Sequence, residues 1–343
     1  MMYEYTKRYI DVDDPNADMF FQIAPADHYR PVPNKINALL SMFEMLAVPD
    51  SYKPALRDAD YVLTPCHFVK DLFSPYTKRP PIVIQEGVEP KEFPYYQRKE
   101  PDYANGERFR IYWSGAPNPR KGYQYMTELI READMRPDRE YYLKTTMPKG
   151  NPLEQQEEAK KHLLSDKLDA ETRKHLERIA SGENIDKFYE YYSKADTIKV
   201  YGKHKNVLFD TRRVPFDELK ELYNKAHVFL FPSQGEGWGL MGTEALCTGC
   251  PVVAPMHTGI KEYFDAQVGY PIGFITREVD ASNYNLRAEV FVPYMDEMFE
   301  QIDRVQSNYK EALERGKRGA KRMRNKFTWD IAGQKLATCL KKI

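Results

Sequence analysis

The sequence has few cysteines, no excess of charge and no long apolar run, and each absence excludes a class of protein. Its 343 residues include only 4 cysteines, too few for a disulfide framework in a chain of this length. Basic and acidic side chains number 51 each, which argues against a dedicated nucleic-acid binder. No apolar run reaches the roughly 18 residues of a membrane span, and the first residues lack the apolar segment of a secretory signal. We therefore expect a cytoplasmic protein.

Two of the cysteines lie close together in the segment CTGC, Cys247–Cys250. Such a pair can serve redox chemistry or bind zinc, but no second CxxC completes a zinc site. Two small buried cysteines beside a turn are the simpler interpretation. Gly249 suits the left-handed position after a helix, and Pro251 ends that helix. We expect no metal ion here.

Short apolar segments alternate with helical patterns along most of the chain. This alternation predicts an α/β fold with βαβ units and parallel sheets. The first series has predicted strands at 19–25, 61–65 and 81–85, with predicted helices at 35–46 and 67–73. The second has predicted strands at 109–115, 141–146, 197–201, 206–209, 228–233 and 251–255, with predicted helices from 122 and over 217–225. Residues 89–107, rich in proline and charge, indicate a linker between them.

Two charged stretches lie outside this alternation. Residues 151–196 place apolar side chains on one stripe and charges elsewhere, which predicts a helical insertion. It could contact an acceptor or a partner, or be a solvated accessory hairpin. The last long helix is basic near its end, which is typical of a solvated face or of a peripheral contact with an anionic surface such as a membrane. The basic residues are Lys317, Arg318, Lys321, Arg322, Arg324 and Lys326.

The segment FLFPSQGEGWGLMGTEALCTGCPVVAP, residues 229–255, has the pattern of a ligand site. It predicts a buried strand, a glycine-rich loop, a helix that begins near Leu240, and another strand. Ligands of open α/β sheets bind at the carboxyl ends of the strands, where loops meet helix N-termini. Gly237, Gly239 and Gly242 lack the Cβ atoms that would keep a ligand from the backbone.

The two glutamates of this segment suit hydroxyl groups rather than phosphate. A carboxylate only accepts hydrogen bonds and would repel an anion. We therefore place a phosphate on the helix N-terminal amides of Leu240 to Thr243. A donor sugar would lie near Glu236 and a ribose near Glu244. This arrangement matches a nucleoside diphosphate sugar.

The segment EGWGLMGTE resembles the E-x7-E signature of retaining glycosyltransferases of family 4. Supporting similarities lie in order along nearly the whole chain, at residues 61–73, 82–93, 117–122, 258–263 and 327–330. The resemblance implies the GT-B fold, in which two Rossmann-like domains face each other. It also implies a UDP- or GDP-linked donor sugar, no cofactor and no dependence on metal.

The resemblance also assigns roles to individual residues. Glu236 would hold the donor sugar and Glu244 the ribose, while Lys121, together with Arg120, would contact the diphosphate. Positive charge there would stabilise the diphosphate as it leaves. The remaining donor-binding residues would be Gly237, Trp238, Gly239, Leu240, Met241, Gly242 and Thr243.

The expected architecture has two unequal domains. Residues 1–105 would form an abbreviated N-terminal domain, with a helix at 330–343 packing back on it. Residues 106–329 would bind the nucleotide sugar and carry the insertion.

Several positions near the expected site need separate comment. Gly115 occupies a place where the family usually has an arginine. His28 and Asp27, after the first strand, are the candidates for the N-terminal residue that the family places near the donor sugar. Glu44 would be either a carboxylate in the interdomain cleft or a residue on a helix surface.

Three functions fit these observations. The first is a retaining glycosyltransferase acting on an unknown acceptor hydroxyl of a glycan, lipid, protein or other molecule. The second is a non-catalytic nucleotide-sugar-binding subunit of a larger complex. The third is another GT-B enzyme, such as an epimerase. Release of free nucleoside diphosphate on turnover would separate a transferase from an epimerase.

Overall fold

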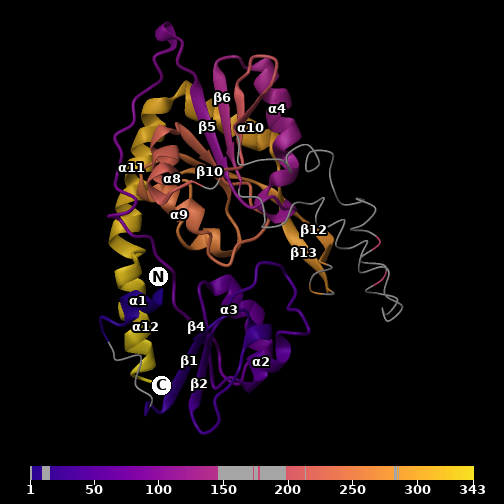
Figure 1. Cartoon of the computed structure of the whole chain (residues 1–343), viewed down its shortest axis with the longest axis vertical. Helices are drawn as coiled ribbons and strands as arrows, with labels where there is room; N and C mark the ends of the chain where they lie inside the picture. The colour runs from indigo at the N-terminus through magenta and orange to yellow at the C-terminus, as the bar shows by residue number, and fades with distance from the viewer. Residues whose placement is uncertain are drawn as a thin grey trace.

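The computed structural model describes residues 2–9, 16–145, 198–212, 214–281, 284 and 286–343, together with Arg173 and Glu177. It contains a parallel four-stranded sheet and a mainly parallel seven-stranded sheet, each at the centre of one unit of the molecule (Figure 1). We call these the N-terminal unit and the C-terminal unit. The predicted α/β class with parallel sheets in two units is observed. Apart from Arg173 and Glu177, the predicted insertion at 151–196 lies outside the described residues.

The N-terminal unit has its four strands in sequence order, all parallel. They are β1 (Met19–Ile23), β2 (Ile36–Leu40), β3 (Tyr61–Thr64) and β4 (Ile82–Val83). The helices α2 (Lys53–Asp58) and α3 (His67–Phe73) connect the last three strands. Three of the strands and α3 lie where the sequence predicts them.

The predicted helix at 35–46 is wrong, because this segment forms strand β2 followed by a loop. Strand β2 lies between β1 and β3. Ala38 and Leu40 contribute to one hydrophobic cluster, whereas Leu39 contributes to another. A strand buried on both faces shows a continuous apolar run rather than alternation. Such a run cannot be distinguished from a buried helix by periodicity alone.

The last helix of the chain packs on the N-terminal unit. Helix α12 (Trp329–Leu340) buries Trp329 and Leu336 in the same cluster as Leu40 and Leu63. The short helix α1 (Met2–Thr6) lies against α12, so both described ends of the chain lie beside the first sheet (Figure 1).

The seven-stranded sheet of the C-terminal unit has the order β11-β10-β9-β5-β6-β8-β7, and only β7 is antiparallel to its neighbour. The strands are β5 (Phe109–Ser114), β6 (Arg139–Lys144), β7 (Ile198–Tyr201), β8 (Val207–Asp210), β9 (Val228–Leu230), β10 (Val252–Pro255) and β11 (Tyr270–Ile272). Helices α4 (Met126–Met135), α10 (Met295–Ser307) and the start of α11 (Tyr309–Lys326) share one core cluster with this sheet. Helices α8 (Phe216–Lys225) and α9 (Leu240–Cys247) contribute to a second hydrophobic cluster, the one that also contains Leu39 of the N-terminal unit.

The order of strands reverses at β5. From β5 the chain continues to β6 on one side, whereas β9 and β10 lie on the other. The loops after β5 and β9 therefore diverge at their carboxyl ends and leave a crevice, the usual ligand position in such sheets. Arg120 and Lys121 follow β5, and Glu236 follows β9.

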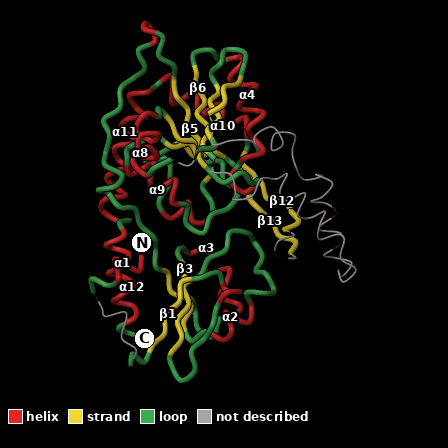
Figure 2. The backbone as a smooth tube through the Cα atoms, in the orientation of Figure 1, coloured by secondary structure: helices red, strands yellow, loops and turns green. Residues whose placement is uncertain are grey.

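An antiparallel hairpin not predicted from the sequence joins the two units. It comprises β12 (Phe274–Ala281) and β13 (Leu286–Pro293), and it extends from the C-terminal unit toward the N-terminal unit (Figure 2). The Tyr284 ring contacts the rings of Phe43 and Tyr52, and Leu46 N–H donates to the Glu289 carbonyl at 3.0 Å.

The main chain crosses between the units at two segments that lie side by side. Val88 and Thr328 form an isolated parallel β-bridge. A Cβ on Gly87 would lie 2.2 Å from the carbonyl carbon of Thr328, so only glycine allows this approach.

None of the described helices is both long enough and apolar enough to cross a membrane.

Candidate functional site

Arg120 and Lys121 lie on a tight turn after β5. The Asn118 side chain accepts a hydrogen bond from Lys121 N–H at 3.1 Å, and Gly122 closes the turn in the left-handed conformation with φ +83°. A Cβ on Gly115 would lie 3.1 Å from the Lys121 Cβ and 2.9 Å from the Trp113 ring. An arginine at position 115 would therefore crowd Lys121, which accounts for the glycine there.

Both cations of this turn contact Glu236. Lys121 Nζ lies 2.5 Å from Oε1 of Glu236, and Arg120 Nη1 lies 3.4 Å from Oε2. The Ser233 hydroxyl donates to Oε1 at 2.7 Å. The predicted site residues Glu236, Lys121 and Arg120 are thus in direct contact, although 115 positions separate Lys121 from Glu236.

Glu236 is almost completely buried, with an exposed fraction of 4%. Burial by itself disfavours the ionised carboxylate, but the positive charges of Lys121 and Arg120, together with the Lys121 and Ser233 hydrogen bonds, outweigh it. They hold the pKa of Glu236 below its usual value. Glu236 is therefore an ionised acceptor at neutral pH.

Glu244, on α9, has different surroundings. Its Oε2 accepts a hydrogen bond from the hydroxyl of Tyr223 at 2.8 Å. Burial raises the pKa of Glu244 to about 7, and the Tyr223 hydrogen bond opposes this shift. Tyr223 is a supporting residue that the sequence analysis missed. The two residues are 21 positions apart and only the fold brings them together.

The N-terminus of α9 offers fewer amides than the sequence suggested. The N–H groups of Gly242 and Thr243 point to the carbonyl of Gly239 at 3.0 and 3.4 Å. This leaves the N–H groups of Leu240 and Met241, for which the described part of the chain provides no acceptor.

The glycines of this segment are explained by protein packing. A Cβ on Gly239 would lie 2.8 Å, and one on Gly242 2.6 Å, from the Tyr263 hydroxyl oxygen. A Cβ on Gly237 would lie 2.6 Å from Met42 Sδ of the N-terminal unit. Trp238 is buried against the rings of Tyr263 and Phe327. Close packing on Tyr263 and Met42 is therefore a sufficient reason for these three glycines, and the expectation that they leave room for a ligand stays a prediction.

The N-terminal unit contributes Glu44 to the site. Its Oε1 lies 3.6 Å from Nη2 of Arg120, and a Cβ on Gly235 would lie 2.1 Å from its carbonyl oxygen. Of the two interpretations of Glu44, the structure supports the cleft carboxylate. The loop after β2 that carries it covers the Glu236 loop in this closed arrangement.

Asp27 and His28 lie in a short 3-10 turn after β1, Ala26–His28. Burial raises the pKa of Tyr284, and the charges of Glu44 and Asp27 add to this effect. His28 is exposed, and no contact between its side chain and the described residues around Glu236 is present.

The structure also describes the paired cysteines and the basic helix. Cys247 and Cys250 are buried free thiols, and burial raises the pKa of both. Arg315, Arg318, Arg322 and Arg324 of α11 donate to main-chain carbonyls of other segments, so the basic surface is largely that of lysines. Within the described ranges, no group of three or more His, Cys, Asp or Glu side chains is arranged to hold a metal ion.

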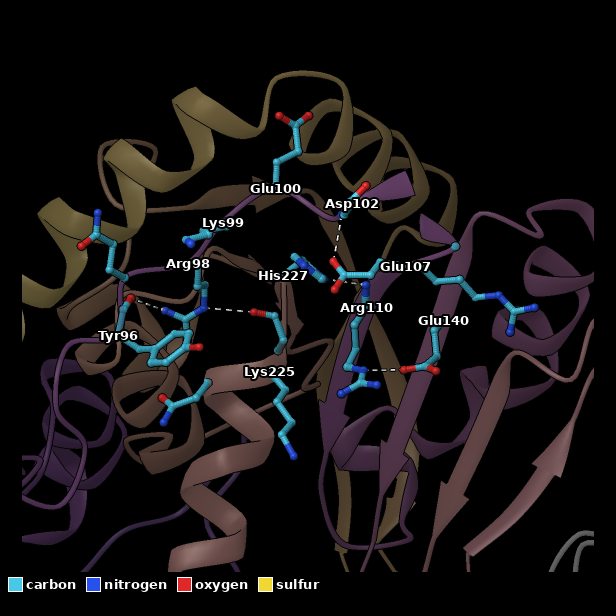
Figure 3. Close-up of a pocket in the computed structure, with 15 residues that line it drawn as sticks. Tyr96, Arg98, Lys99, Glu100, Asp102, Glu107, Arg110, Glu140, Lys225 and His227 are labelled. Carbon is cyan, nitrogen blue, oxygen red and sulfur yellow. Dashed lines mark hydrogen bonds and ion pairs between the residues drawn. The ribbon is translucent and has the colours of Figure 1, made fainter. Parts of the chain in front are cut away.

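A cavity of about 760 Å³ lies away from these residues, at the amino ends of β5, β6 and β9 (Figure 3). Several of its charged side chains pair with other groups of the protein. Arg110 forms an ion pair with Glu140, and Arg98 donates to the carbonyls of Ala226 and Thr248. Burial lowers the pKa of His227 to about 4, so this imidazole is neutral. We place the functional site at the opposite edge of the sheet, where the unlike charges converge around Glu236.

Several solved structures have an arrangement similar to that of most of this chain. Sucrose-phosphate synthase from Thermosynechococcus elongatus superposes with a TM-score of 0.58 at 17% identity, over 90% of this chain and 68% of that one. TarM of S. aureus superposes with a TM-score of 0.59 at 12% identity. The match covers 98% of this chain and 57% of TarM, so this chain spans less than two thirds of TarM. HepE of Anabaena, in a complex with UDP-glucose, superposes with a TM-score of 0.57 at 13% identity, over 90% of this chain and 73% of HepE.

These likenesses define the class: the chain has the GT-B fold of glycosyltransferases. Residues 194–336 match the family model described as "Family 4 Glycosyltransferase in conflict systems". The resemblance to family 4 glycosyltransferases that the sequence indicated is thereby confirmed. The matched residues include Glu236, Glu244 and all of α9.

Proposed function

We propose that the protein transfers a sugar from a nucleoside diphosphate sugar to an acceptor hydroxyl, with retention of anomeric configuration. The observation that carries this proposal is the convergence of Lys121, Arg120 and Glu236 at the point where the strand order reverses. Cations beside a buried carboxylate, next to a helix N-terminus, suit a ligand that combines hydroxyl groups with a diphosphate. HepE binds UDP-glucose on the same fold, which makes a UDP-sugar the first donor to test.

In the proposed reaction, the bond between the anomeric carbon and the diphosphate oxygen breaks, and the acceptor oxygen bonds to that carbon on the same face. The acceptor proton passes to the departing diphosphate. Lys121 and Arg120 would exchange part of their contact with Glu236 for the diphosphate and stabilise its charge. Glu236 would accept hydrogen bonds from donor-sugar hydroxyls, and Glu244 from the ribose. We infer that these cations supply the positive charge without a metal ion.

Matched amide substitutions test this division of roles. Glu244→Gln should weaken UDP binding by about tenfold or more, because a hydrogen bond to a charged group is worth roughly 1.5–3 kcal/mol. Glu236→Gln should leave UDP affinity nearly unchanged, because UDP has no donor sugar, but should slow turnover. Calorimetry with UDP measures the first effect. Release of UDP from UDP-glucose, with water as acceptor and with EDTA present, measures the second.

Three outcomes would contradict the proposal. Equal losses of UDP affinity in both variants would remove the division of roles. Inactivation by EDTA with rescue by magnesium would remove the metal-independent mechanism. Interconversion of sugars without release of nucleoside diphosphate, across UDP- and GDP-sugars, would indicate an epimerase.

A further inference from the structure

The main chain of Glu236 is held by a second loop, His257–Gly259, which follows β10. Glu236 N–H donates to the Thr258 hydroxyl oxygen at 3.1 Å, and Gly259 N–H donates to the Glu236 carbonyl at 2.9 Å. Both polar groups of the Glu236 backbone are therefore fixed from outside their own loop. Gly259 allows the approach, because a Cβ there would lie 2.5 Å from the carbonyl oxygen of Gly237.

Thr258 makes its contact from an unfavourable backbone conformation. Its φ is +45°, in the left-handed region. This region is costly for residues with a Cβ and most costly for β-branched ones. The other described non-glycine residues with positive φ are Asn34 and Lys205, neither of them β-branched. Such strain persists only where surrounding contacts enforce it, and it is concentrated at functional sites.

The neighbours of Thr258 hold its hydroxyl in place. Nδ1 of His257 lies 3.1 Å from Oγ1 of Thr258, and a hydroxyl has enough lone pairs and protons for both contacts. The His257 ring is buried and stacks on Phe291 of β13 at 4.7 Å between ring centroids. Phe291 N–H in turn donates to the Gln234 carbonyl at 3.0 Å. The hairpin thus supports both loops.

We propose that Thr258 is a positioning residue for Glu236: its hydroxyl fixes the Glu236 backbone, and the strained conformation is retained because it aims that hydroxyl. The consequence for turnover rests on the proposed role of Glu236. The consequence for the backbone does not.

Three substitutions at one position separate hydroxyl from strain. Thr258→Ser keeps the hydroxyl, Thr258→Ala loses it and keeps a Cβ, and Thr258→Gly loses both. Amide hydrogen exchange of residues 233–239 should be about three- to tenfold faster in the Ala and Gly variants and near wild type in Ser. The melting temperature of the Gly variant should exceed that of the Ala variant by about 2 °C or more, the reverse of the usual order of these residues.

Turnover of UDP-glucose is the functional measurement. It should fall about tenfold or more in both the Ala and the Gly variant, with KM changed less than kcat, and should recover in Ser. If the Gly variant is less stable than the Ala variant, the inference that Thr258 is strained is wrong. If amide exchange of residues 233–239 is unchanged in the Ala variant, the inference that the Thr258 hydroxyl fixes the Glu236 backbone is wrong. Activity that follows melting temperature rather than the hydroxyl would assign Thr258 a structural role only. Wild-type turnover in Glu236→Gln would instead overturn the proposed role of Glu236, whatever the Thr258 variants show.

Discussion

Glu236 and Glu244 lie eight residues apart, yet their surroundings move their pKa values in opposite directions. Glu236 is buried beside two cations, which hold its pKa below the usual value. Glu244 is only partly exposed and forms no ion pair within the described part of the chain, and burial of its carboxyl raises its pKa to about 7. The two carboxylates therefore differ in ionisation near neutral pH, and this difference can be measured.

Donor binding should depend on pH through Glu244. Ribose hydroxyls donate to an ionised carboxylate, and protonation removes acceptor capacity. The ionised fraction of a group with a pKa of about 7 rises roughly tenfold from pH 6 to pH 8, so UDP-glucose affinity should rise about five- to tenfold. Calorimetry between pH 6 and pH 8 measures this affinity. UDP-glucose is the suitable ligand because none of its phosphate groups titrates in this range.

Glu244→Gln is the control for this dependence, since an amide does not titrate. Its UDP-glucose affinity should be flat between pH 6 and 8, and an unchanged slope would contradict the assignment. Folding stability provides a second check with the opposite sign. Between pH 4.5 and about 7, the folded protein keeps a proton on Glu244 that the unfolded chain has already released. The contribution of this group to the free energy of unfolding therefore falls as pH rises through that window.

At the scale of elements, Gly316 allows α11 to approach the turn that follows α9. A Cβ on Gly316 of α11 would lie 2.1 Å from the carbonyl oxygen of Gly249, two residues beyond the end of α9. Gly249 itself has φ +77° and lies just after the helix, as the sequence predicted. The backbones of the two elements thus meet without an intervening side chain.

Gly316→Ala should therefore destabilise the protein, although alanine normally stabilises a helix by about 1 kcal/mol relative to glycine. The added Cβ meets a backbone atom that cannot rotate away, and we expect a loss of about 1–3 kcal/mol. Chemical denaturation measures the change. Gly319→Ala is the matched control in the same helix, because its Cβ would meet the end of the flexible Leu246 side chain at 2.8 Å. Equal effects in both variants would contradict the backbone contact.

The sequence predicted most strands and the helices around the site, because buried parallel strands and amphipathic helices have strong local patterns. It failed at 35–46, where burial on both faces of β2 removes the pattern. It also missed the β12–β13 hairpin, although its polar turn and flanking β-branched residues were present. For the candidate site, motif spacing predicted Glu236, Glu244 and Lys121, and the structure brings Lys121 and Glu236 into contact. Tyr223 and Thr258 were missed, because their role follows from contacts between distant segments.

At the scale of the molecule, the two units close on the candidate site. Glu262 of the C-terminal unit accepts hydrogen bonds from His67 N–H and from the Gln85 side chain, both at 2.8 Å. Arg120 contacts Glu44 across the same cleft. Because Glu236 is only 4% exposed, we expect that a donor sugar, if it binds there as proposed, reaches Glu236 only after the units separate.

Glu262→Ala should weaken this closure. The substitution removes both hydrogen bonds and also the contact between the carboxylate and His67 Nδ1 at 2.8 Å. Loss of these three contacts raises the open population, so UDP-glucose should associate about three- to tenfold faster, while the melting temperature falls. Stopped-flow binding measures the rate. Glu278→Ala, which removes only an exposed ion pair with Arg287 at 3.6 Å, should leave it unchanged. Identical association rates in wild type and Glu262→Ala would show that closure does not limit entry.

The side-by-side crossings at Val88 and Thr328 bear on how the protein can be divided. Because α12 returns to the first sheet and buries Trp329 and Leu336 there, the N-terminal unit is assembled from both ends of the sequence. A fragment that stops in the linker would leave one face of the four-stranded sheet uncovered. The part of the chain between the crossings, by contrast, is continuous and has its own core. We therefore expect the C-terminal unit to be the one that can be expressed as one continuous fragment, whereas the N-terminal unit must be rebuilt from two pieces of polypeptide.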